Sequence, residues 1–591
     1  MMTDSGFSKN AQLIAQKRYL KVDENGKPAE TIDSMFKRIA KFIIQGETDI
    51  SDKKETYKIP TKENIDELES KFFEIQHNLE FLSGMVMLDR GKKDLVAACY
   101  VMPIHDSLES IYSTLAQTVI LHRRGAGIGY DFSEIRPEGS LIKSTGKTAT
   151  GPISFMRLFD FSSEIIMNRG SVRHAGHMGI LRIDHPDIEK FIYAKKEYTQ
   201  LTNFNLSIAI TDKFIKAYEN NMYYELVHED KIYKKIKARE MLQKIAQSIY
   251  ESGEPGFIFI DEINRYNPTP KAGKFTSTNQ CGEQPLLPYE ACNLGSLVLT
   301  KFLIKEKIDE KIKPEEKINW DRLKEVIKLG VRFLDNTITI SNHLLPEIER
   351  MVKFGNRKIG IGVMGWADIL YELNIPYDSD EAINLAEKIM SYITENARLE
   401  SSVLGKQRGN FGCFDGSIWQ EKGFKTMRNA TVTTIAPTGT TSLFADCNGG
   451  IEPFFALGYI RKNMETIDNT DLLYINEILK EKLKKEWLYD KEIMKDIITQ
   501  GSLQHLKQLP AEIRKVFVTS LDITPIWHIK MQAAFQQYTD NAVSKTINFK
   551  ESSTVKDIIK SFEMACKLKL KGMSIYRDKS RNLQVLNLNN K

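Results

Sequence analysis

The segment Asn279-Gln-Cys-Gly-Glu-Gln-Pro-Leu-Leu-Pro-Tyr-Glu-Ala-Cys-Asn-Leu-Gly-Ser296 contains two of the six cysteines of this 591-residue chain. The surroundings of Cys281 are polar and rich in turn-forming residues, whereas a structural cysteine usually has apolar neighbours. In an extended loop, residues two apart point to the same side of the chain. We therefore expect Asn279, Cys281 and Glu283 to face a common substrate.

These three side chains could act together on one substrate. A carboxylate can take a proton from a substrate hydroxyl, and an amide can orient that hydroxyl. Glu283 disfavours a thiolate at Cys281 because like charges repel, so this cysteine is poorly suited to ordinary nucleophilic catalysis. A neutral thiol is better suited to hydrogen-atom chemistry. On spacing alone, a buried loop cysteine without a catalytic role is the alternative interpretation.

The composition excludes several classes of protein. Hydrophobic residues make up 41% of the chain and charged residues 27%, which excludes a disordered, collagen-like or coiled-coil protein. A net charge of +5 is too small for this length to indicate binding of nucleic acid. Six cysteines without a Cys-x-x-Cys pair do not predict a disulfide scaffold, a zinc ribbon or a thioredoxin-type site.

The start of the chain and its apolar runs give no sign of a membrane protein. Residues 1–10 are polar and lack the features of a signal peptide. No run approaches the roughly 18 apolar residues of a membrane-spanning helix. We therefore expect no membrane partner and a cytoplasmic, reducing setting in which the cysteines remain thiols.

The order of helical and short apolar segments along the sequence indicates one large domain rather than four small ones. Residues 1–95 are rich in Lys and Glu and show helical periodicity at 35–44 and 65–82. From residue 96, short apolar segments such as 127–132 and 257–263 alternate with helical stretches, which predicts an α/β domain. We expect this domain to occupy 96–463 and 517–591, with a helical insertion at 464–516. Clear amphipathic helices are predicted at 320–345 and 381–405.

Several ordered motifs then identify a family. Together with residues 267–296, the chain resembles the ribonucleotide reductases, most closely their adenosylcobalamin-dependent (class II) branch. The matching segments are Ala98-Cys-Tyr-Val101, Asp106-Ser-Leu-Glu-Ser-Ile111, Arg124-Gly-Ala-Gly-Ile-Gly129, His185-Pro-Asp-Ile188, Gly362-Val-Met-Gly-Trp-Ala-Asp368, Ala436-Pro-Thr-Gly-Thr-Thr-Ser442, Gly450-Ile-Glu-Pro453 and Tyr576-Arg-Asp578.

The resemblance implies a fold and a set of roles. The fold is a ten-stranded α/β barrel, with the loop of Cys281 in its centre and a helical N-terminal layer. Cys281 would become a thiyl radical that abstracts the 3′ hydrogen of a ribose. Glu283 would take the proton of the 3′-hydroxyl, and Asn279 would hold the ribose hydroxyls. Cys99 and Cys292 would be the dithiol that supplies two electrons and ends as a disulfide. We expect structural roles for the other three cysteines, Cys413, Cys447 and Cys566.

A second glycine-containing segment is a candidate phosphate site. It offers backbone N–H groups and hydroxyls at an expected helix start, but it lacks the Gly-Lys-Ser/Thr ending of a P-loop. From the pattern alone, an ordinary helix cap is the alternative. The resemblance implies that the segment holds the substrate diphosphate, and that Gly127 and Gly129 lie near the substrate. The residues of this segment are Pro437, Thr438, Gly439, Thr440, Thr441 and Ser442.

The resemblance also implies a homodimer with a deoxynucleoside triphosphate effector at its interface. Arg173 lies in the second effector loop, residues 169–177. That loop departs from the Gly-Gly-x-Arg-Arg-Gly-Ala pattern of the family, which leaves open which effector selects which base. The expected effector residues are Asp106, Ser107, Arg136, Lys143 and Arg173.

The radical source decides the cofactor. Class I reductases receive the radical through adjacent C-terminal tyrosines, whereas only Tyr576 stands at the matching place here. No glycyl-radical motif is recognisable, so the expected cofactor is adenosylcobalamin. The pairs Glu74/His77 and Glu225/His228 have the spacing of di-iron ligands, but we predict no metal site. The alternatives are a class I catalytic subunit with a separate metal-radical partner, and an inactive nucleotide-binding regulatory paralogue.

The sequence departs from the family pattern in its N-terminal region and in its last ten residues. The N-terminal region does not resemble an ATP-binding cone, so we expect no on/off regulation by ATP and dATP. Residues 582–591 contain no cysteine, whereas most relatives carry a Cys pair there. The active-site disulfide is therefore expected to be reduced by an external thiol reductant, which could be a thioredoxin-like protein, another copy of the chain or a small dithiol.

Overall fold

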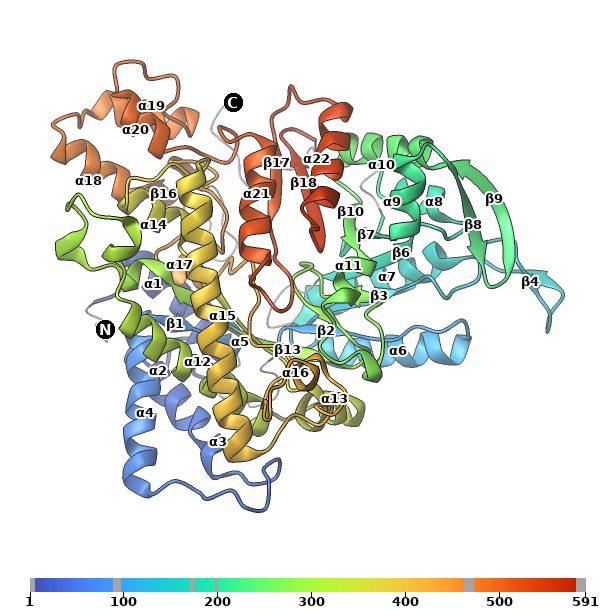
Figure 1. Ribbon diagram of the computed structural model, residues 1–591, viewed down its shortest axis with the longest axis horizontal. Coiled ribbons are helices and arrows are strands. Elements are labelled where there is room, and N and C mark those ends of the chain that lie inside the picture. Colours follow the sequence, from blue (N-terminus) through green and yellow to red (C-terminus); the bar gives the residue numbers. More distant parts are fainter. Residues whose placement is uncertain (1–5, 89–96, 171–175, 197–199, 462–471, 581–591) are drawn as a thin grey trace.

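The computed structural model describes residues 6–88, 97–170, 176–196, 200–461 and 472–580 (Figure 1). The N-terminal region is a layer of helices, drawn in blue at one end of the molecule. The helix predicted at 65–82 ends at His77, where the chain turns into a short strand. The elements of this layer are α1 (Lys9–Ile14), α2 (Ile32–Ile43), α3 (Gln45–Thr48), α4 (Lys62–His77), β1 (Phe81–Leu82) and α5 (Gly84–Leu88).

The core is a ten-stranded sheet that curls into a barrel. Its hydrogen-bonded order is β1-β13-β2-β3-β6-β7-β10-β18-β17, and β14 pairs with the other edge of β13. The strands are β2 (Cys99–Val101), β3 (Gly127–Asp131), β6 (His177–Arg182), β7 (Phe204–Ile210), β10 (Gly256–Phe259), β13 (Ala291–Val298), β14 (Ile359–Met364), β17 (Thr546–Phe549) and β18 (Gly572–Arg577).

Two parallel halves make up this barrel. Strands β2, β3, β6, β7 and β10 run parallel to one another, as do β13 with β14 and β17 with β18. The halves meet in antiparallel fashion at β13–β2 and at β10–β18. Residues 431–435 close the ring through parallel bridges from Thr433 to Ile361 and from Ile435 to Val543. The expected ten-stranded α/β barrel is therefore confirmed.

Helices cover the outside of the barrel (Figure 1). The helix predicted at 320–345 spans α12, and the one predicted at 381–405 spans α15. The strand predicted at 257–263 is shorter than expected, because the chain turns into α11 directly after β10. The main helices are α6 (Leu108–His122), α7 (Pro152–Gly170), α9 (Asp212–Glu219), α10 (Ala238–Ser252), α11 (Ile260–Arg265), α12 (Trp320–Ile340), α14 (Trp366–Glu372), α15 (Asp380–Arg408), α21 (Pro525–Gln536) and α22 (Val555–Lys567).

The predicted insertion has a small core of its own where it is described. Its buried side chains, among them Leu479, Leu483 and Ile497, cluster with Tyr371 of α14. Its elements are β16 (Leu472–Ile475), which pairs with β15 (Gly458–Arg461), and the helices α18 (Glu477–Lys485), α19 (Lys491–Gln500) and α20 (Ala511–Val516). None of the helices in the described ranges combines the length and apolar character needed to cross a bilayer.

A buried network of charges fastens the helical layer to the barrel. Arg408 of α15 donates to Glu47 of the layer at 2.5 Å and to Asp335 of α12 at 2.7 Å. Arg357 links Asp335, at 2.8 Å, to Asp52 of the layer. All five side chains are fully or almost fully buried. A buried charge is tolerated only when its partners are present, so the layer and the barrel depend on each other here.

Asp335→Asn tests this fastening. Burial alone raises the pKa of Asp335, but Arg357, Arg428 and Arg408 outweigh burial and hold it well below the usual range. Its stabilising effect is therefore present above about pH 4 and lost as the pH falls further. We expect the variant to lower the free energy of unfolding at pH 7 by about 3–5 kcal/mol in urea titrations.

The control and the pH dependence sharpen this test. Asp321→Asn removes an exposed carboxylate from the same helix and should cost less than about 1 kcal/mol. The difference between wild type and Asp335→Asn should shrink as the pH is lowered below about 4. An equal effect of the two variants at pH 7 would contradict the role given to Asp335.

Candidate functional site

A short hairpin carries Cys281 into the barrel. Strands β11 (Ser277–Thr278) and β12 (Pro285–Leu286) pair antiparallel, and the residues between them form its tip. The tip is a turn in which the Gly282 N–H donates to the Asn279 carbonyl at 3.1 Å. Gly282 has a φ of 82°, a conformation that glycine adopts without strain. The expectation of an extended loop was therefore wrong, because a turn changes the direction of the chain at Cys281.

The turn still brings the predicted polar residues together. The Asn279 amide nitrogen lies 3.0 Å from the Sγ of Cys99, and the Cys99 Sγ lies 3.9 Å from a carboxylate oxygen of Glu283. Asn279 and Glu283 are buried, whereas Cys281 is partly exposed. Asn279 and Glu283 thus meet around Cys99, a residue almost two hundred positions earlier in the sequence.

Cys99 and Cys292 lie opposite each other on neighbouring strands. Cys99 begins β2, Cys292 is the second residue of β13, and the antiparallel register pairs them directly. Side chains opposite each other in such a pair have Cβ atoms about 4.5–5.5 Å apart, close to the span of a disulfide. Both cysteines are buried, and both are thiols in the structure. The register therefore creates a buried dithiol that a small movement would allow to oxidise.

The surroundings of Cys292 keep its thiol protonated. Burial raises its pKa well above the usual value; Lys358 opposes this effect, and Glu283 and Glu290 add to it. Lys358 is itself buried and forms an ion pair with Glu290 at 2.5 Å. Since a thiolate is the attacking form in ordinary thiol chemistry, Cys292 is not set up as a nucleophile.

Two glycines of β3 make room for the hairpin. A Cβ on Gly129 would lie 1.7 Å from the carbonyl oxygen of Thr278, and a Cβ on Gly127 would lie 1.9 Å from the side-chain oxygen of Gln280. Neither glycine has a positive φ, so the close approach of the hairpin, and not the backbone conformation, explains why both positions are glycine. Their predicted nearness to the substrate stays a prediction; the structure places them directly beneath the hairpin.

The hairpin tip opens into a cavity of about 320 Å³. The cavity joins Cys281, Glu283 and Cys99 to the predicted phosphate segment, of which it exposes residues 437–441. Ser442 is buried and is absent from the cavity wall. Pockets of about 300–1,000 Å³ hold small molecules, so this one is large enough for a single nucleotide.

The phosphate segment is a tight loop before the short helix α17 (Thr441–Phe444). Thr438 has a φ of 52°, which is rare outside glycine, and its hydroxyl accepts the N–H of Gly450 at 2.9 Å. The Ser442 N–H donates to the Thr438 carbonyl at 2.8 Å. A Cβ on Gly439 would meet nothing within 4 Å. Gly439 therefore borders open space, as a loop that receives a ligand requires.

Sequence reasoning missed part of the cavity wall. Gln280 lies on it, and its buried side-chain oxygen has no hydrogen-bond partner among the described residues. Arg18 and Tyr19 reach the cavity from the helical layer, and Met85 and Leu88 reach it from α5. No local pattern marks these four residues. Gln280, by contrast, stands between the candidate residues Asn279 and Cys281, and this position could have indicated that it lies at the site.

Of the predicted effector residues, the structure brings Asp106, Ser107 and Arg136 together but not Lys143. Arg136 donates to Asp106 at 2.6 Å, and the Ser107 hydroxyl caps α6 by accepting the N–H of Ser110 at 3.1 Å. Lys143 is exposed in the hairpin of β4 (Leu141–Ile142) and β5 (Lys147–Thr148), which projects from the body in Figure 1. Arg173 lies outside the described residues.

The remaining cysteines lie away from the hairpin tip. Cys413 and Cys566 are half-buried against apolar clusters, and burial raises the pKa of the Cys566 thiol to about 12. Cys447 follows the phosphate segment, and burial raises its pKa well above the usual value. None of the three lines the cavity.

The two Glu-x-x-His pairs have other partners. Glu74 binds Arg322 and His77 binds Asp33, each pair at the surface. Glu225 forms an ion pair with Lys235 across the hairpin of β8 (Tyr223–His228) and β9 (Lys231–Lys237), and the His228 ring contacts the backbone carbonyl of Glu134 at 3.1 Å. No group of three or more potential metal-binding side chains occurs in the described ranges.

Comparison with known proteins gives the same family over the whole chain. The sequence model of the "ribonucleotide reductase, barrel domain" matches residues 97–426 and 422–576, and that of the "all-alpha domain" matches residues 5–83. The vitamin B12-dependent ribonucleoside-diphosphate reductase of Thermoplasma acidophilum is 39% identical, covering 99% of this chain and 80% of that protein. Its namesake from Mycobacterium tuberculosis is 40% identical, covering 98% and 80%.

A solved structure supports the fold. The alpha subunit of the class Id ribonucleotide reductase of Actinobacillus ureae superposes with a TM-score of 0.75. The two chains are 23% identical, and the match covers 98% of this chain and 99% of the other. The barrel and its helical layer are therefore shared across a wide sequence distance.

Gly129→Ala tests how the hairpin is held. The new methyl group would meet the backbone of Thr278, which can yield only if the hairpin moves, so we expect a loss of about 1–3 kcal/mol in unfolding free energy. Gly127→Ala is the matched control, because it meets only the movable end of the Gln280 side chain. The Cys281 thiol should react faster with an alkylating reagent in Gly129→Ala than in Gly127→Ala, as measured by mass spectrometry. Equal rates would show that the contact does not hold the hairpin.

Proposed function

Because this chain belongs to the ribonucleotide reductases, and is 39–40% identical to two of their vitamin B12-dependent members, we propose that it reduces ribonucleoside diphosphates to 2′-deoxyribonucleotides for DNA synthesis, with adenosylcobalamin as its cofactor. One observation carries the proposal: a single cavity joins Cys281, Glu283 and Cys99 to the loop of residues 437–441. A nucleotide that spans this cavity would place its ribose at the hairpin tip and its phosphates at the loop.

The site fits a cofactor that must reach a thiol. Cys281 is partly exposed on the cavity wall, whereas Cys99 and Cys292 are buried, so Cys281 is the accessible member of the three. Met85 and Leu88 of α5 give the same wall an apolar surface and would hold the adenosyl part of the cofactor. The chemistry that adenosylcobalamin supplies when bound is the removal of a hydrogen atom from a thiol.

The residues of the chain then act in a defined order. The Cys281 sulfur, as a thiyl radical, takes the 3′ hydrogen of the ribose, and Glu283 accepts the proton of the 3′-hydroxyl. The 2′-hydroxyl leaves as water after accepting a proton from the dithiol. Cys99 and Cys292 supply two electrons and two protons in all and form a disulfide. Cys281 finally returns its hydrogen atom to the 3′ carbon, and Glu283 returns the proton to the 3′ oxygen, so both groups are restored.

The polar groups around the ribose have supporting roles. The amide of Asn279 donates to the Cys99 sulfur at 3.0 Å, which supports a role for this amide in orienting the ribose hydroxyls. The partnerless oxygen of Gln280 is an acceptor for a substrate hydroxyl or amine. The hydroxyls of Thr438, Thr440 and Thr441 would donate to the diphosphate, together with N–H groups of the loop.

The same geometry weighs against the two alternatives. An inactive regulatory paralogue would have no need for the five reacting side chains, which are all present and close together. A class I catalytic subunit is less favoured, because the relatives that match at 39–40% identity are named vitamin B12-dependent. At 28% identity the match includes both a "ribonucleoside-diphosphate reductase subunit alpha" from Chlamydia pneumoniae and a vitamin B12-dependent reductase from Streptomyces clavuligerus.

Further partners follow from the surface and the thiols. Helix α6 packs against α7, and five large apolar side chains on them are 44–62% exposed, which suits a homodimer interface. Asp106 lies just before α6 and pairs with Arg136, and a deoxynucleoside triphosphate effector would bind there. An external dithiol would reduce the buried disulfide, in a reducing cytoplasm. The exposed apolar residues are Leu108, Tyr112, Ile120, Phe161 and Ile165.

Cys281→Ser tests the proposed chemistry. A serine O–H bond is too strong to exchange a hydrogen atom with a ribose carbon, so reduction of CDP with adenosylcobalamin and dithiothreitol should fall by a factor on the order of 10³ or more. CDP binding should stay within about threefold, because serine is close to cysteine in size. Cys413→Ser, which alters a cysteine outside the cavity, should keep full turnover. Turnover by Cys281→Ser at the wild-type rate would refute the mechanism.

A further inference from the structure

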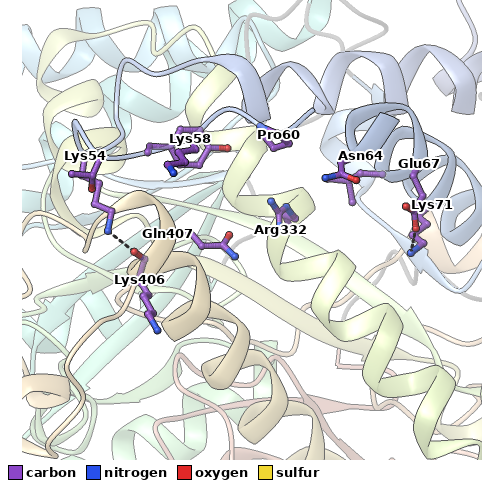
Figure 2. Close-up of a pocket in the computed structure, with 12 residues that line it drawn as sticks. Lys54, Lys58, Pro60, Asn64, Glu67, Lys71, Arg332, Lys406 and Gln407 are labelled. Carbon is purple, nitrogen blue, oxygen red and sulfur yellow. Dashed lines mark hydrogen bonds and ion pairs between the residues drawn. The ribbon is translucent and has the colours of Figure 1, made fainter. Parts of the chain in front are cut away.

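A second and larger cavity lies between the helical layer and the helices α12 and α15. Its volume is about 590 Å³, and it shares no wall residue with the cavity at Cys281. The segment between α3 and α4, the start of α4, the middle of α12 and the end of α15 enclose it (Figure 2). We call it the basic pocket, after its charged wall residues Lys54, Lys58, Lys71, Arg332, Lys406 and Glu67.

Positive charge dominates this wall. Glu67 is the sole carboxylate among the wall residues, and Lys71 neutralises it at 2.7 Å (Figure 2). Lys54 donates to the backbone carbonyl of Lys406 at 2.5 Å, which leaves its charge unneutralised. The ammonium groups of Lys58 and Lys406 have no hydrogen-bond or ion-pair partner among the described residues. Lys54, Lys58 and Lys406 thus border the pocket without a carboxylate partner among the described residues.

The floor of the pocket adds to this imbalance. Arg332 donates to Glu47 through Nε at 2.8 Å and Nη2 at 2.9 Å, while its Nη1 has no partner among the described residues. Beneath it lies the buried charge network, whose cations outnumber its carboxylates even when Glu400 is included. The cations are Lys53, Arg332, Arg357, Arg408 and Arg428, and the carboxylates are Glu47, Asp52, Asp335 and Glu400.

Helix α4 and a few apolar groups complete the pocket. Thr61 caps this 16-residue helix, and Asn64 of its first turn lies on the wall, so the positive end of the helix dipole adds to the field. Tyr57, Pro60 and Leu68 form an uncharged surface beside the cations. The Tyr57 hydroxyl donates to the Glu47 carbonyl at 3.0 Å, which fixes the ring.

We propose that the basic pocket binds the polyphosphate group of a small molecule, of the class of nucleoside triphosphates. Lys54, Lys58, Lys406 and Nη1 of Arg332 would hold the phosphate oxygens, since charge-assisted hydrogen bonds to phosphate are the strongest that these donors can form. The surface of Tyr57 and Leu68 would take an attached base. Occupancy would act on Arg332, which connects the pocket to the network that fastens the layer to the barrel.

Lysine footprinting on the full chain tests the site directly. The chain is labelled with an amine-reactive reagent at constant ionic strength, with or without tripolyphosphate or ATP, and modification is read by mass spectrometry. We expect both ligands to protect Lys58 and Lys406 severalfold, while the exposed Lys41 of α2 reacts at an unchanged rate. Protection at lower concentration by ATP than by tripolyphosphate identifies a nucleotide site, and equal protection identifies a site for the phosphates alone.

A matched pair of variants measures the contribution of one lysine. In Lys58→Ala, the tripolyphosphate concentration that half-protects Lys406 should rise by about tenfold or more, because one charge-assisted contact is lost. Lys41→Ala makes the same change in net charge outside the pocket and should leave that concentration unchanged. The proposal is overturned if neither ligand protects Lys58 and Lys406, if Lys58→Ala has no effect, or if only an acidic peptide such as polyaspartate protects them. None of these readouts depends on turnover.

Discussion

The contact between the β11–β12 hairpin and β3 is the constraint on which the centre of this protein depends. The hairpin must pass so close to the sheet that even one methyl group on Gly129 would collide with the Thr278 backbone. Because it passes there, its tip lies over the start of β2, and Asn279 and Glu283 reach the sulfur of Cys99. The strand register then supplies Cys292 as the neighbour of Cys99. Backbone geometry therefore assembles the proposed reaction centre from three distant parts of the chain.

A second constraint holds the barrel and the helical layer together. Glu47 and Asp52 of the layer are fully buried beside arginines of the barrel, and neither part could leave its charges unpaired in an apolar interior. The layer also contributes Arg18 and Tyr19 to the cavity at Cys281. The charge network therefore affects the reaction cavity as well as the stability of the chain. The network also forms the floor of the basic pocket. A candidate ligand site therefore lies directly against the contact between the barrel and the helical layer.

Candidate reacting residues could be named from the sequence because the chemistry itself restricts which residues can serve. A cysteine set among amide, glycine and carboxylate residues is unusual, and the ordered motifs around it identify a family and its barrel. The path of the loop could not be predicted in the same way. Asn279 and Glu283 are neighbours because of a turn at Gly282, whereas the spacing argument assumed an extended chain.

Contacts between distant segments were beyond the reach of sequence patterns. Neither the opposition of Cys99 and Cys292 nor the collision that keeps Gly129 a glycine leaves a local signal. The first depends on the register of β2 and β13 and was expected only through the family resemblance, and the second depends on where the β11–β12 hairpin crosses β3. The basic pocket is a similar case, because its lysines come from separate segments that look like ordinary solvated surface. Among the elements, the helix predicted at 65–82 and the strand predicted at 257–263 failed at their ends, where short apolar runs fit either structure.

The most direct measurement of the central claim is a single turnover by the chain alone. The reduced chain is mixed with adenosylcobalamin and CDP, without an external reductant or a second protein, and product and thiols are counted by mass spectrometry. The account predicts up to about one dCDP per chain, with a disulfide formed between Cys99 and Cys292. It would be contradicted if product required a second protein, or if product formed while Cys99 and Cys292 both remained thiols.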